Sequence, residues 1–476
     1  MFQKNKKFYI TTSIAYTNAP PHIGFALESI QADVIARYHR SLGQDVFFLT
    51  GTDEHGAKVS KKADESKKNP KDFVDEISEK FKGLKKVLNL STDYFIRTTD
   101  KSKHWPAVEN VWRKLEENGD IYKKNYKGLY CVGCEAFITK KDLIRGKCSI
   151  HGAEPEVIEE ENYFFRLSKY SKQIEDIFKN NKIKIIPESR KSETLNFIKQ
   201  GLEDISFSRP RKDLKWGIPV PGDQTQTIYV WADALTNYIS ALDYPKGEQF
   251  KKFWPADIHC IGKDIAKFHC LFWPAMLLSL KLTLPKSIFI HGHITVSGQK
   301  MSKSLGNVID PVELVKKYGA DAVRYYLLRE IPSAEDGDFS YKKFEQRYNS
   351  DLAGGIGNLV ARLLGISGKS KTPIKKPSKK TQKKINQTKK NCKTAIEKFK
   401  FNEALAVIWE LISYCDKYIN EEKLWETKKP EAINDLFYTL NEIGDLLLPF
   451  LPDTSEKIKK AIKDKKSEIQ FPRISN

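Results

Sequence analysis

Three cysteines and one histidine between residues 131 and 151 have the spacing of a metal site. They are Cys131, Cys134, Cys148 and His151, in the pattern C-x2-C-x13-C-x2-H. Two close pairs separated by a loop can complete a tetrahedron around Zn²⁺, which prefers thiolate and imidazole ligands. Because all four ligands come from the protein, no position remains for a reactive water. We therefore expect one structural zinc ion; buried thiols without metal would leave the paired spacing unexplained.

A second set of candidate residues stands where a strand-like segment gives way to a helical pattern. The sequence there is Pro21-His22-Ile23-Gly24-Phe25. A helix N-terminus presents unpaired amide hydrogens and a positive dipole end, and so binds phosphate. His22 can donate to phosphate oxygens, and Gly24 lets a nucleotide approach the backbone. Taken alone, a histidine at this position is more often a helix cap.

A lysine-bearing loop lies much further along the chain. Lys300-Met301-Ser302-Lys303-Ser304 follows Gly298 and precedes Gly306. Two lysines on a glycine-flanked loop can close over a polyphosphate and neutralise the charge that develops there. By itself such a string is more often an exposed surface loop.

Strand and helix signals around these residues predict a parallel α/β domain. Residues 8–15 and 45–50 are strand-like, and residues 25–40 have the apolar spacing of an amphipathic helix. A strand–helix–strand unit of this size implies a parallel sheet. Strand and helix patterns return at 227–231, 257–261 and 287–291.

The second half of the chain has helical periodicity after residue 320. Leu359, Leu363 and Leu364 share one helical pattern, and Leu405, Ile408 and Ile412 share another. Residues 366–400, between them, are dense in lysine and contain two prolines. We interpret that stretch as a solvated linker followed by the start of a basic helix.

Composition sets the broad class of the protein. With 476 residues, 40% hydrophobic and 11% aromatic, the chain can form two to four compact units and is not wholly disordered. The formal charge of +20 favours an anionic partner such as nucleic acid, with a merely solvated lysine-rich surface an equal alternative. Apolar runs such as 272–280 are too short to span a membrane, and residues 1–7 lead directly into a strand. We therefore expect a cytoplasmic protein, or an organellar one only after removal of a presequence. The remaining cysteines are scattered and are expected to be buried: Cys260, Cys270, Cys392 and Cys415.

The order and spacing of segments 21–25 and 300–304 resemble the HIGH and KMSKS motifs of the class I aminoacyl-tRNA synthetases. In that family the two motifs hold ATP while an amino-acid carboxylate attacks the α-phosphorus and pyrophosphate leaves. The resemblance implies His22, Lys300 and Lys303 as catalytic residues, with Mg²⁺ accompanying ATP. It implies ATP contacts from His22, Gly24, Lys263, Asp264, Lys300, Ser302 and Lys303. Solvated charges in a turn are the ordinary alternative for Lys263 and Asp264.

One position departs from the family pattern. Phe25 replaces the second histidine of HIGH, and phenylalanine cannot donate a hydrogen bond. Losing one such donor costs a factor of about 10² to 10³ in rate. Another group substitutes for it, or the enzyme is slower, or the chain is a noncatalytic tRNA-binding relative.

Segments 14–18, 51–56, 229–234, 261–264 and 268–274 are similar to the methionyl-tRNA synthetases. By that resemblance Asp53 meets the substrate ammonium, and the methionine pocket is formed by Ile14, Tyr16, Trp231, Leu235, Tyr238, His269 and Trp273. Aromatic walls suit the polarizable sulfur, at roughly 0.3–1.5 kcal/mol per contact, and a tyrosine hydroxyl can donate weakly to it. For any one of these residues an ordinary core role is the alternative. Activation of cysteine, isoleucine, leucine or valine instead is disfavoured by the aromatic pocket and by the absence of a large editing insertion.

The resemblance also implies that the C-terminal part reads the anticodon of tRNA(Met), initiator tRNA included. Asn358 and Arg362 share one helix face, and Trp425 would stack on a base, worth roughly 1–3 kcal/mol. A solvated helix face is the alternative for the first two residues. The expected fold is a Rossmann-like parallel-sheet domain split by a zinc-binding insertion and followed by an α-helical domain, in a monomer. The expected divisions are 1–113 and 224–290 for the Rossmann domain, 114–223 for the insertion, 291–345 for the KMSKS and stem-contact region, and 346–476 for the anticodon-binding domain.

Overall fold

The computed structural model describes residues 6–133, 135–138, 140–149, 152–301, 306–367, 374–464, 466 and 471–474. Their contacts divide the chain into two compact units. The first unit contains residues 1–20, 43–83 and 92–290, and the second contains 21–42, 84–91 and 291–476.

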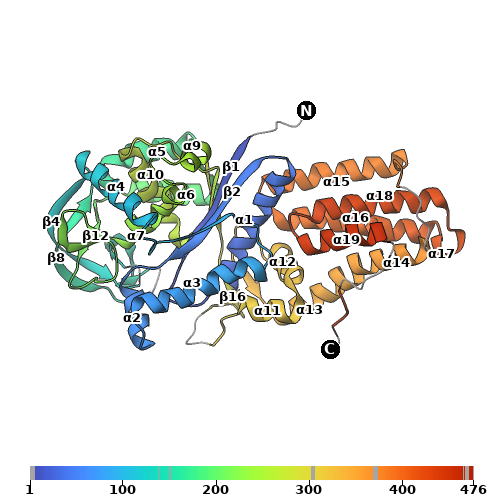
Figure 1. The fold of residues 1–476 in the computed structure, drawn as a ribbon, viewed down its shortest axis with the longest axis horizontal. Helices are drawn as coiled ribbons and strands as arrows, with labels where there is room; N and C mark the ends of the chain where they lie inside the picture. The colour runs from blue at the N-terminus through green and yellow to red at the C-terminus, as the bar shows by residue number, and fades with distance from the viewer. Residues whose placement is uncertain are drawn as a thin grey trace. The chain divides into compact units, whose positions relative to one another are not determined.

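A six-stranded sheet forms the centre of the first unit (Figure 1). Its order is β3 (Tyr94–Arg97), β2 (Asp45–Asp53), β1 (Lys7–Tyr16), β14 (Ile258–Gly262), β15 (Ser287–His291) and β9 (Lys184–Ile186). β1 pairs in parallel with β2 and β14, β2 with β3, and β15 with β9. The predicted parallel α/β fold is confirmed.

The strand order fixes where a ligand can enter this sheet. β1 lies between β2 and β14, so successive crossovers leave β1 in opposite directions. In open parallel sheets of this kind, ligands bind outside the carboxyl ends of the strands at such a switch point. The ends of β1, β2 and β14 are therefore the part of the first unit to search for a site.

Helices and one short π-helical turn complete the first unit. They are α2 (Ala57–Glu65), α3 (Pro70–Val87), α4 (His104–Glu117), α5 (Ser171–Lys179), α6 (Glu188–Lys199), α7 (Val230–Leu235), α8 (Asn237–Ser240), α9 (Glu248–Phe253), η4 (Phe268–Phe272) and α10 (Trp273–Ser279). Segment 227–231 divides between two elements, because β13 (Asp223–Ile228) ends before α7 begins. The main hydrophobic core includes Tyr9, Leu49, Trp112 and Trp273.

The range predicted as an insertion builds an antiparallel sheet of its own. β4 (Ile121–Cys131) pairs along its length with β8 (Glu156–Phe165), flanked by β5 (Ala136–Ile138) and β10 (Ile205–Ser206). The same range also supplies β9, the edge strand of the main sheet. The chain between 114 and 223 is thus built into the Rossmann sheet, and the division itself stays a prediction.

The second unit is mainly helical, as predicted. Its helices are α1 (Ile23–Ser41), α11 (Pro311–Tyr318), α12 (Ala320–Arg329), α13 (Tyr341–Arg347), η6 (Tyr348–Gly357), α14 (Asn358–Ser367), α15 (Lys379–Glu397), α16 (Phe401–Glu421), α17 (Leu424–Thr427), α18 (Pro430–Leu447) and α19 (Pro452–Asp464). Helices α14, α15, α16, α18 and α19 pack against one another (Figure 1). The six apolar side chains expected to share helical faces, from Leu359 to Ile412, are buried.

A small sheet interrupts the helices of the second unit. β16 (Ile294–Val296) pairs with β17 (Gln299–Lys300) and in parallel with β18 (Gly337–Phe339). The predicted all-helical pattern after residue 320 is therefore wrong at β18, because pairing with β16 gives that short stretch a strand partner that sequence periodicity cannot reveal. The lysine-rich stretch becomes α15, and its residues 368–373 lie outside the described part of the chain.

A buried ion pair lies at the centre of the second unit. Arg324 on α12 and Asp33 on α1 are both fully buried, with Nη2 and Oδ2 2.8 Å apart. Arg324 also donates to the carbonyl oxygens of Leu88, Pro449 and Phe450. One guanidinium thus joins four segments of the chain.

The remaining sequence expectations concern cysteines and membrane spans. Cys260, Cys270, Cys392 and Cys415 are buried, as predicted, and burial raises the pKa of Cys270 and of Cys392 to about 12. Among the described residues, no helix is both long enough and apolar enough to cross a membrane.

Candidate active site

Asp53 is the last residue of β2, next to Tyr16 at the end of β1 in the parallel register. Its side chain is 8% exposed, and Oδ1 is buried without a hydrogen-bond partner among the described residues. Burial raises the pKa of Asp53 well above its ordinary range, and Asp233 and Glu135 raise it further. Such a carboxylate is costly to bury and would gain most from a cationic partner.

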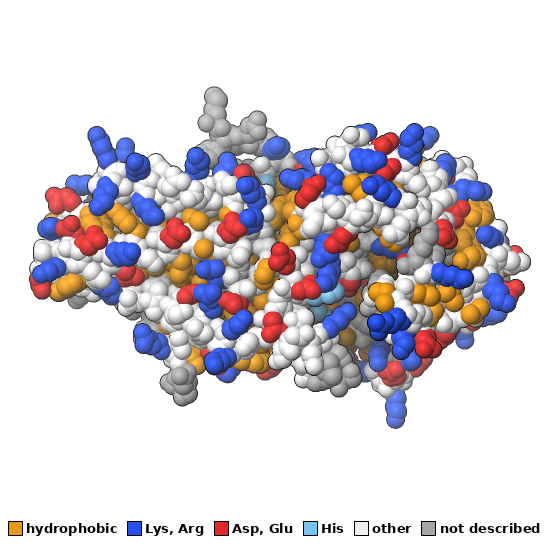
Figure 2. Space-filling view, turned by 180° about the vertical axis from the view of Figure 1, so that it is seen from behind, with side chains coloured by type: hydrophobic (Ala, Val, Ile, Leu, Met, Phe, Trp, Pro, Cys, Tyr) orange, Lys and Arg blue, Asp and Glu red, His pale blue; other side chains and the backbone are white. Residues whose placement is uncertain are grey.

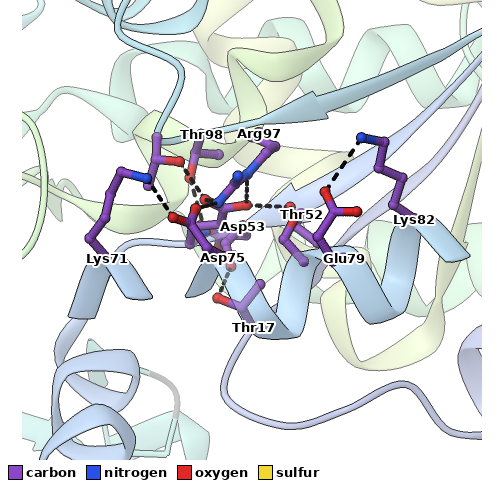
Figure 3. A network of polar contacts seen from close by, with 12 residues as sticks. Thr17, Thr52, Asp53, Lys71, Asp75, Glu79, Lys82, Arg97 and Thr98 are labelled. Carbon is purple, nitrogen blue, oxygen red and sulfur yellow. Dashed lines mark hydrogen bonds and ion pairs between the residues drawn. The ribbon is translucent and has the colours of Figure 1, made fainter. Parts of the chain in front are cut away.

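The strand end that carries Asp53 is held by its neighbours (Figure 3). Thr17 donates to the Asp53 carbonyl oxygen from both its N–H, at 2.9 Å, and its hydroxyl, at 3.1 Å. The adjacent Glu54 is fully buried, and Arg97 donates to both of its carboxylate oxygens at 2.7 and 2.8 Å. Arg97 also reaches Asp75 at 2.5 Å. Asp53 is therefore fixed by its backbone; its carboxylate accepts the backbone N–H of His55, and Oδ1 stays without a partner among the described residues.

A second buried carboxylate, Asp233 on α7, lies between two histidines. His55 Nδ1 is 2.6 Å from its Oδ2, and His104 Nε2 is 2.7 Å from its Oδ1. Burial alone would raise the pKa of Asp233, but the two histidines lower it below its ordinary value. Asp233 thus stays ionised and adds negative potential near Asp53.

Tyr238 and His269, two members of the expected methionine pocket, are joined by a hydrogen bond whose direction can be deduced. His269 Nδ1 lies 3.0 Å from the carbonyl oxygen of Ile265, which can only accept, so Nδ1 carries a proton. In the neutral ring Nε2 then accepts from the Tyr238 hydroxyl at 2.7 Å. The hydroxyl hydrogen of Tyr238 is thus used by His269, so Tyr238 offers a sulfur its ring and oxygen rather than a donor.

Trp273 is fully buried behind this wall. Its Nε1 donates to His259 Nε2 at 3.3 Å, and His259 Nδ1 is 2.9 Å from the Thr11 hydroxyl. Burial, followed by the nearby His269, lowers the pKa of His259 well below its ordinary value. His259 is therefore neutral and lies between Trp273 and Thr11 on β1.

The expected methionine residues come together in the first unit. Trp231 stacks on Phe268 with centroids 3.7 Å apart and planes 6° from parallel. Leu235, Tyr238 and Trp273 belong to one hydrophobic cluster, and Ile14, Tyr16 and Trp231 are partly buried against it. Six of the predicted pocket residues thus belong to the large hydrophobic core of the first unit or pack against it, and His269 contacts Tyr238.

His22 and Gly24 of the first expected ATP motif lie close to Met301, at the start of the lysine loop, in the second unit. His22 is exposed, precedes α1 in an extended conformation, and accepts the Gly24 N–H on Nδ1 at 3.0 Å. In the neutral ring Nε2 then carries the hydrogen that can reach a phosphate. A Cβ on Gly24 would lie 2.8 Å from His22 Cε1 and 3.8 Å from Met301 Cε. His22 therefore both caps the helix and lies near the lysine loop.

The other expected ATP residues are placed less completely. Lys300 is exposed at the end of β17, whereas Ser302 and Lys303 lie outside the described residues. Lys263 and Asp264 form a short turn, η3 (Lys263–Ile265), directly after β14 in the first unit. That position at the end of β14 agrees with the place where a sheet of this order binds a ligand.

The expected anticodon residues lie on the helices of the second unit. Asn358 begins α14 and is exposed, and Arg362 follows one turn later. Arg362 donates to Asp416 at 2.9 Å and to Asn420 at 2.7 Å. Trp425 on α17 is 49% exposed, a large apolar surface for a solvated position. An exposed tryptophan suits base stacking, and a guanidinium held by Asp416 and Asn420 suits base-edge recognition.

Two of the four expected zinc ligands are described. Cys131 and Cys148 are buried together in one small cluster with Ile138. The turn after Cys148 closes through its carbonyl oxygen, which accepts the Gly152 N–H at 2.7 Å. Cys134 and His151 lie outside the described residues, and within the described ranges no three ligand-type side chains form a metal-binding group. The buried sulfur pair and the closed turn fit a thiolate-bound ion.

Several residues at this site were not singled out from the sequence. Glu135, His55, Asp233 and Phe268 all contact the expected pocket or lie beside Asp53. Three of them lie inside the segments that carried the resemblance. Glu135 directly follows Cys134, and its place inside the metal-ligand pattern gives no sign of a role in the pocket.

Charge does not locate the partner on the surface. Figure 2 shows lysine and arginine side chains spread over the visible face, with acidic side chains among them. On this face the basic side chains form no single patch, so a nucleic-acid contact there must be inferred from specific residues.

Comparison with known proteins assigns the chain to a family. The family described as "tRNA synthetases class I (M)" matches residues 8–148 and 134–364, and "Anticodon-binding domain of tRNA ligase" matches residues 379–474. The methionine–tRNA ligase of Thermotoga maritima is 45% identical over 95% of this chain and 74% of that protein. This chain belongs to the methionine–tRNA ligase family.

Other relatives agree with this assignment. The methionine–tRNA ligase of Brucella suis is 41% identical over 95% of this chain and 91% of that protein. The structure of Mycobacterium tuberculosis methionyl-tRNA synthetase in complex with methionyl-adenylate has a TM-score of 0.89 and 37% identity. It is matched over 95% of this chain and 93% of that chain. Methionine–tRNA ligases thus match this chain in sequence and in fold.

Proposed function

We propose that this chain activates methionine with ATP and transfers it to the 3′-terminal adenosine of tRNA(Met), initiator tRNA included. The observation that carries the proposal is the buried Asp53, whose Oδ1 lacks a partner among the described residues beside a continuous aromatic cluster. The arrangement suits a small ligand with an ammonium group and an apolar, polarizable side chain. Methionine has both features.

The first step would use positioning and charge more than covalent chemistry. Asp53 holds the ammonium, so the methionine carboxylate can attack the α-phosphorus of ATP while pyrophosphate leaves. His22 and the amides at the start of α1 stabilise phosphate oxygens, and Lys300 and Lys303 neutralise charge on the leaving group. Mg²⁺ would accompany the nucleotide as part of the substrate.

One zinc ion held by Cys131, Cys134, Cys148 and His151 is part of the proposal. When bound, it would join the cysteine-bearing hairpin, formed by β4 and β5 (residues 121–138), to Cys148 and His151 by coordinating thiolates and imidazole. Its support is the buried cluster containing Cys131 and Cys148 and the chemistry of the donor set. We further propose a monomer that acts in the cytoplasm.

Methionine-dependent exchange of labelled pyrophosphate into ATP tests the first step. We expect exchange with methionine and with no other amino acid. Lys303→Ala should lower the exchange rate much more than it raises the KM for methionine, since the charge it meets grows in the transition state. Absence of exchange with methionine would contradict the proposal.

Phe25 is the specific observation behind a second candidate function, a noncatalytic tRNA-binding relative. The variant Phe25→His restores the missing donor and should raise the exchange rate of an active enzyme by no more than about 10³-fold. Tight tRNA binding with no exchange in the wild type, and exchange only in Phe25→His, would select the noncatalytic alternative. The family assignment does not favour that alternative.

Trp425→Ala tests the anticodon assignment. Loss of one stacked base should lower kcat/KM for tRNA charging by about 10- to 100-fold and leave pyrophosphate exchange intact. Leu424→Ala, at the adjacent and fully buried position, is the contrasting variant and should lower thermal stability. A loss of both reactions in Trp425→Ala would show that Trp425 has a structural role.

A further inference from the structure

Glu135 belongs to the cysteine-bearing hairpin but its side chain reaches the expected methionine pocket. Its side chain is 8% exposed. One carboxylate oxygen, Oε2, accepts a hydrogen bond from the Tyr16 hydroxyl at 2.6 Å. The other, Oε1, accepts the backbone N–H of Lys58 at 3.0 Å. Both oxygens are therefore used by groups that line or adjoin the pocket.

The surrounding backbone is built to fit this carboxylate. Gly56 has φ +118°, and a Cβ there would clash with the Tyr16 hydroxyl and lie 3.0 Å from Glu135 Oε1. Glu135 itself has φ +49°, a left-handed conformation that is uncommon for a glutamate. Lys58 Nζ donates in turn to the Gly133 carbonyl oxygen. Gly56 and Lys58 on one segment thus contact Gly133 and Glu135 on the other, around the Tyr16 hydroxyl group.

The charge of Glu135 acts in the same direction as its geometry. It lies near Asp53, whose pKa it helps to raise, so it adds negative potential where an ammonium would bind. Its hydrogen bond to Tyr16 fixes a ring that belongs to the expected methionine pocket. Glu135 itself need not touch the ligand to have both effects.

We propose that Glu135 is a positioning residue for methionine, holding Tyr16 in place and thereby coupling the cysteine-bearing hairpin to methionine affinity. The inference rests on the proposed activation of methionine. By reciprocity, methionine binding must stabilise the hairpin as much as the hairpin favours methionine. No other contact between Tyr16 and this hairpin is needed for the coupling.

The first experiment compares the KM for methionine and kcat in pyrophosphate exchange. Glu135→Ala should raise the KM about tenfold or more and change kcat by less than about threefold, because Tyr16 is no longer held for a methionine side chain that it contacts equally in the substrate-bound and transition states. Glu135→Gln can accept from Lys58 N–H with its oxygen and donate to the Tyr16 oxygen with its amide. It should therefore have a KM closer to that of the wild type.

The matched control is Glu159→Ala. Glu159 lies on β8 in the same part of the chain, is 68% exposed, and pairs only with Lys127 among the described residues. It should leave both constants unchanged. An unchanged KM in a folded Glu135→Ala protein, with an active wild type, would overturn the inference while leaving the proposed function standing. An inactive wild type would instead overturn the proposed function.

A double-mutant cycle tests whether Tyr16 mediates the effect. If it does, Glu135→Ala should raise the KM much less in a Tyr16→Phe background than in the wild type. Equal factors in both backgrounds would show that the two residues act independently and would overturn the coupling.

Hydrogen–deuterium exchange of peptides covering residues 129–148 gives a readout that needs no Glu135 variant. Methionine alone should slow exchange there in the wild type and have a smaller effect in Tyr16→Phe. No protection in the wild type, or equal protection in Tyr16→Phe, would overturn the inference even if Glu135→Ala fails to fold.

Discussion

Two buried aspartates, one in each unit, have opposite surroundings. Asp33 in the second unit lies 2.8 Å from Arg324 and 2.8 Å from Arg37, and Ser91 donates to it from backbone and side chain. Burial alone would raise the pKa of Asp33, but the two arginines and Ser91 lower it. Asp53 in the first unit has no ion-pair partner among the described residues, and burial together with Asp233 and Glu135 raises its pKa.

The difference separates a carboxylate that stabilises the fold from one that is kept for a ligand. A buried charge with its own counterion is satisfied and has nothing left to bind. A buried charge without one destabilises the protein until a cation arrives, and this unfavourable term favours binding. The same residue type thus has different roles, set by what the neighbouring segments supply.

The largest effect is expected from removing the counterion of Asp33. Arg324→Met leaves Asp33 with Arg37 as its remaining counterion and leaves several buried backbone carbonyl oxygens without their donor, and should lower the free energy of unfolding by about 3–5 kcal/mol. Denaturant unfolding measures this value. Lys316→Met, an exposed position on α11, is the control and should change stability by less than about 0.5 kcal/mol. A loss that small in Arg324→Met would break the comparison.

Asp53→Asn should impair the use of methionine without lowering the stability of the protein. Removing the charge should lower kcat/KM for methionine by about 100-fold or more, since an ionic hydrogen bond to the ammonium is lost. Thermal stability without ligand should be equal to or above that of the wild type, because no buried charge remains unpaired. Differential scanning fluorimetry measures the stability of Asp53→Asn without ligand and its stabilisation by methionine. Strong destabilisation without ligand would show that Asp53 has a structural role.

The neighbouring Glu54 sharpens the comparison within the first unit. It is fully buried like Asp53, but Arg97 pairs with both of its oxygens. Arg97→Gln should therefore destabilise the protein by about 1–3 kcal/mol, measured by denaturant unfolding. Its effect on methionine KM should be smaller than that of Asp53→Asn. The reverse order of KM effects would mean that Glu54, rather than Asp53, meets the ligand.

The smallest and most diagnostic effects concern pH. Asp33 has a lowered folded pKa, so its stabilisation is present above its unfolded pKa and is lost as pH falls through the folded value. Asp53 has a raised pKa in the folded protein. In the ligand-free protein its ionisation therefore lowers the free energy of unfolding as pH rises above the pKa that Asp53 has in the unfolded chain.

Methionine needs the ionised form of Asp53. Its affinity should therefore increase with pH through the raised pKa of Asp53, with release of a proton, below the pKa of the methionine ammonium. Calorimetry in buffers of different ionisation enthalpy detects that proton. Retention of the same proton release in Asp53→Asn would assign it to another group.

Much of the fold was predictable because it depends on local pattern. The first strand, the helix from residue 25 and the second strand were expected within a few residues of β1, α1 and β2. Aromatic, β-branched and periodically apolar residues specify those elements from their own neighbours. β9 and β18 were not predicted, since each is only three residues long and exists through pairing with a distant strand.

The candidate site was predictable as a set of residues and much less as a set of interactions. The resemblance supplied Asp53, Tyr16, Tyr238 and the rest of the expected pocket, and the structure places the apolar and aromatic members, His269 apart, in or against the core of the first unit. The roles of Ser302 and Lys303, and of the complete zinc ligand set, stay predictions.

The sequence by itself determined which residues carry chemistry, because side-chain type and motif spacing are properties of the chain alone. The tertiary structure decided how each one is used. It gave Asp33 an arginine, gave Asp53 no ion-pair partner among the described residues, committed the Tyr238 hydrogen to His269, and brought Glu135 to Tyr16. Charge state and hydrogen-bond direction depend on groups distant in sequence, which only the packed fold brings within a few ångströms.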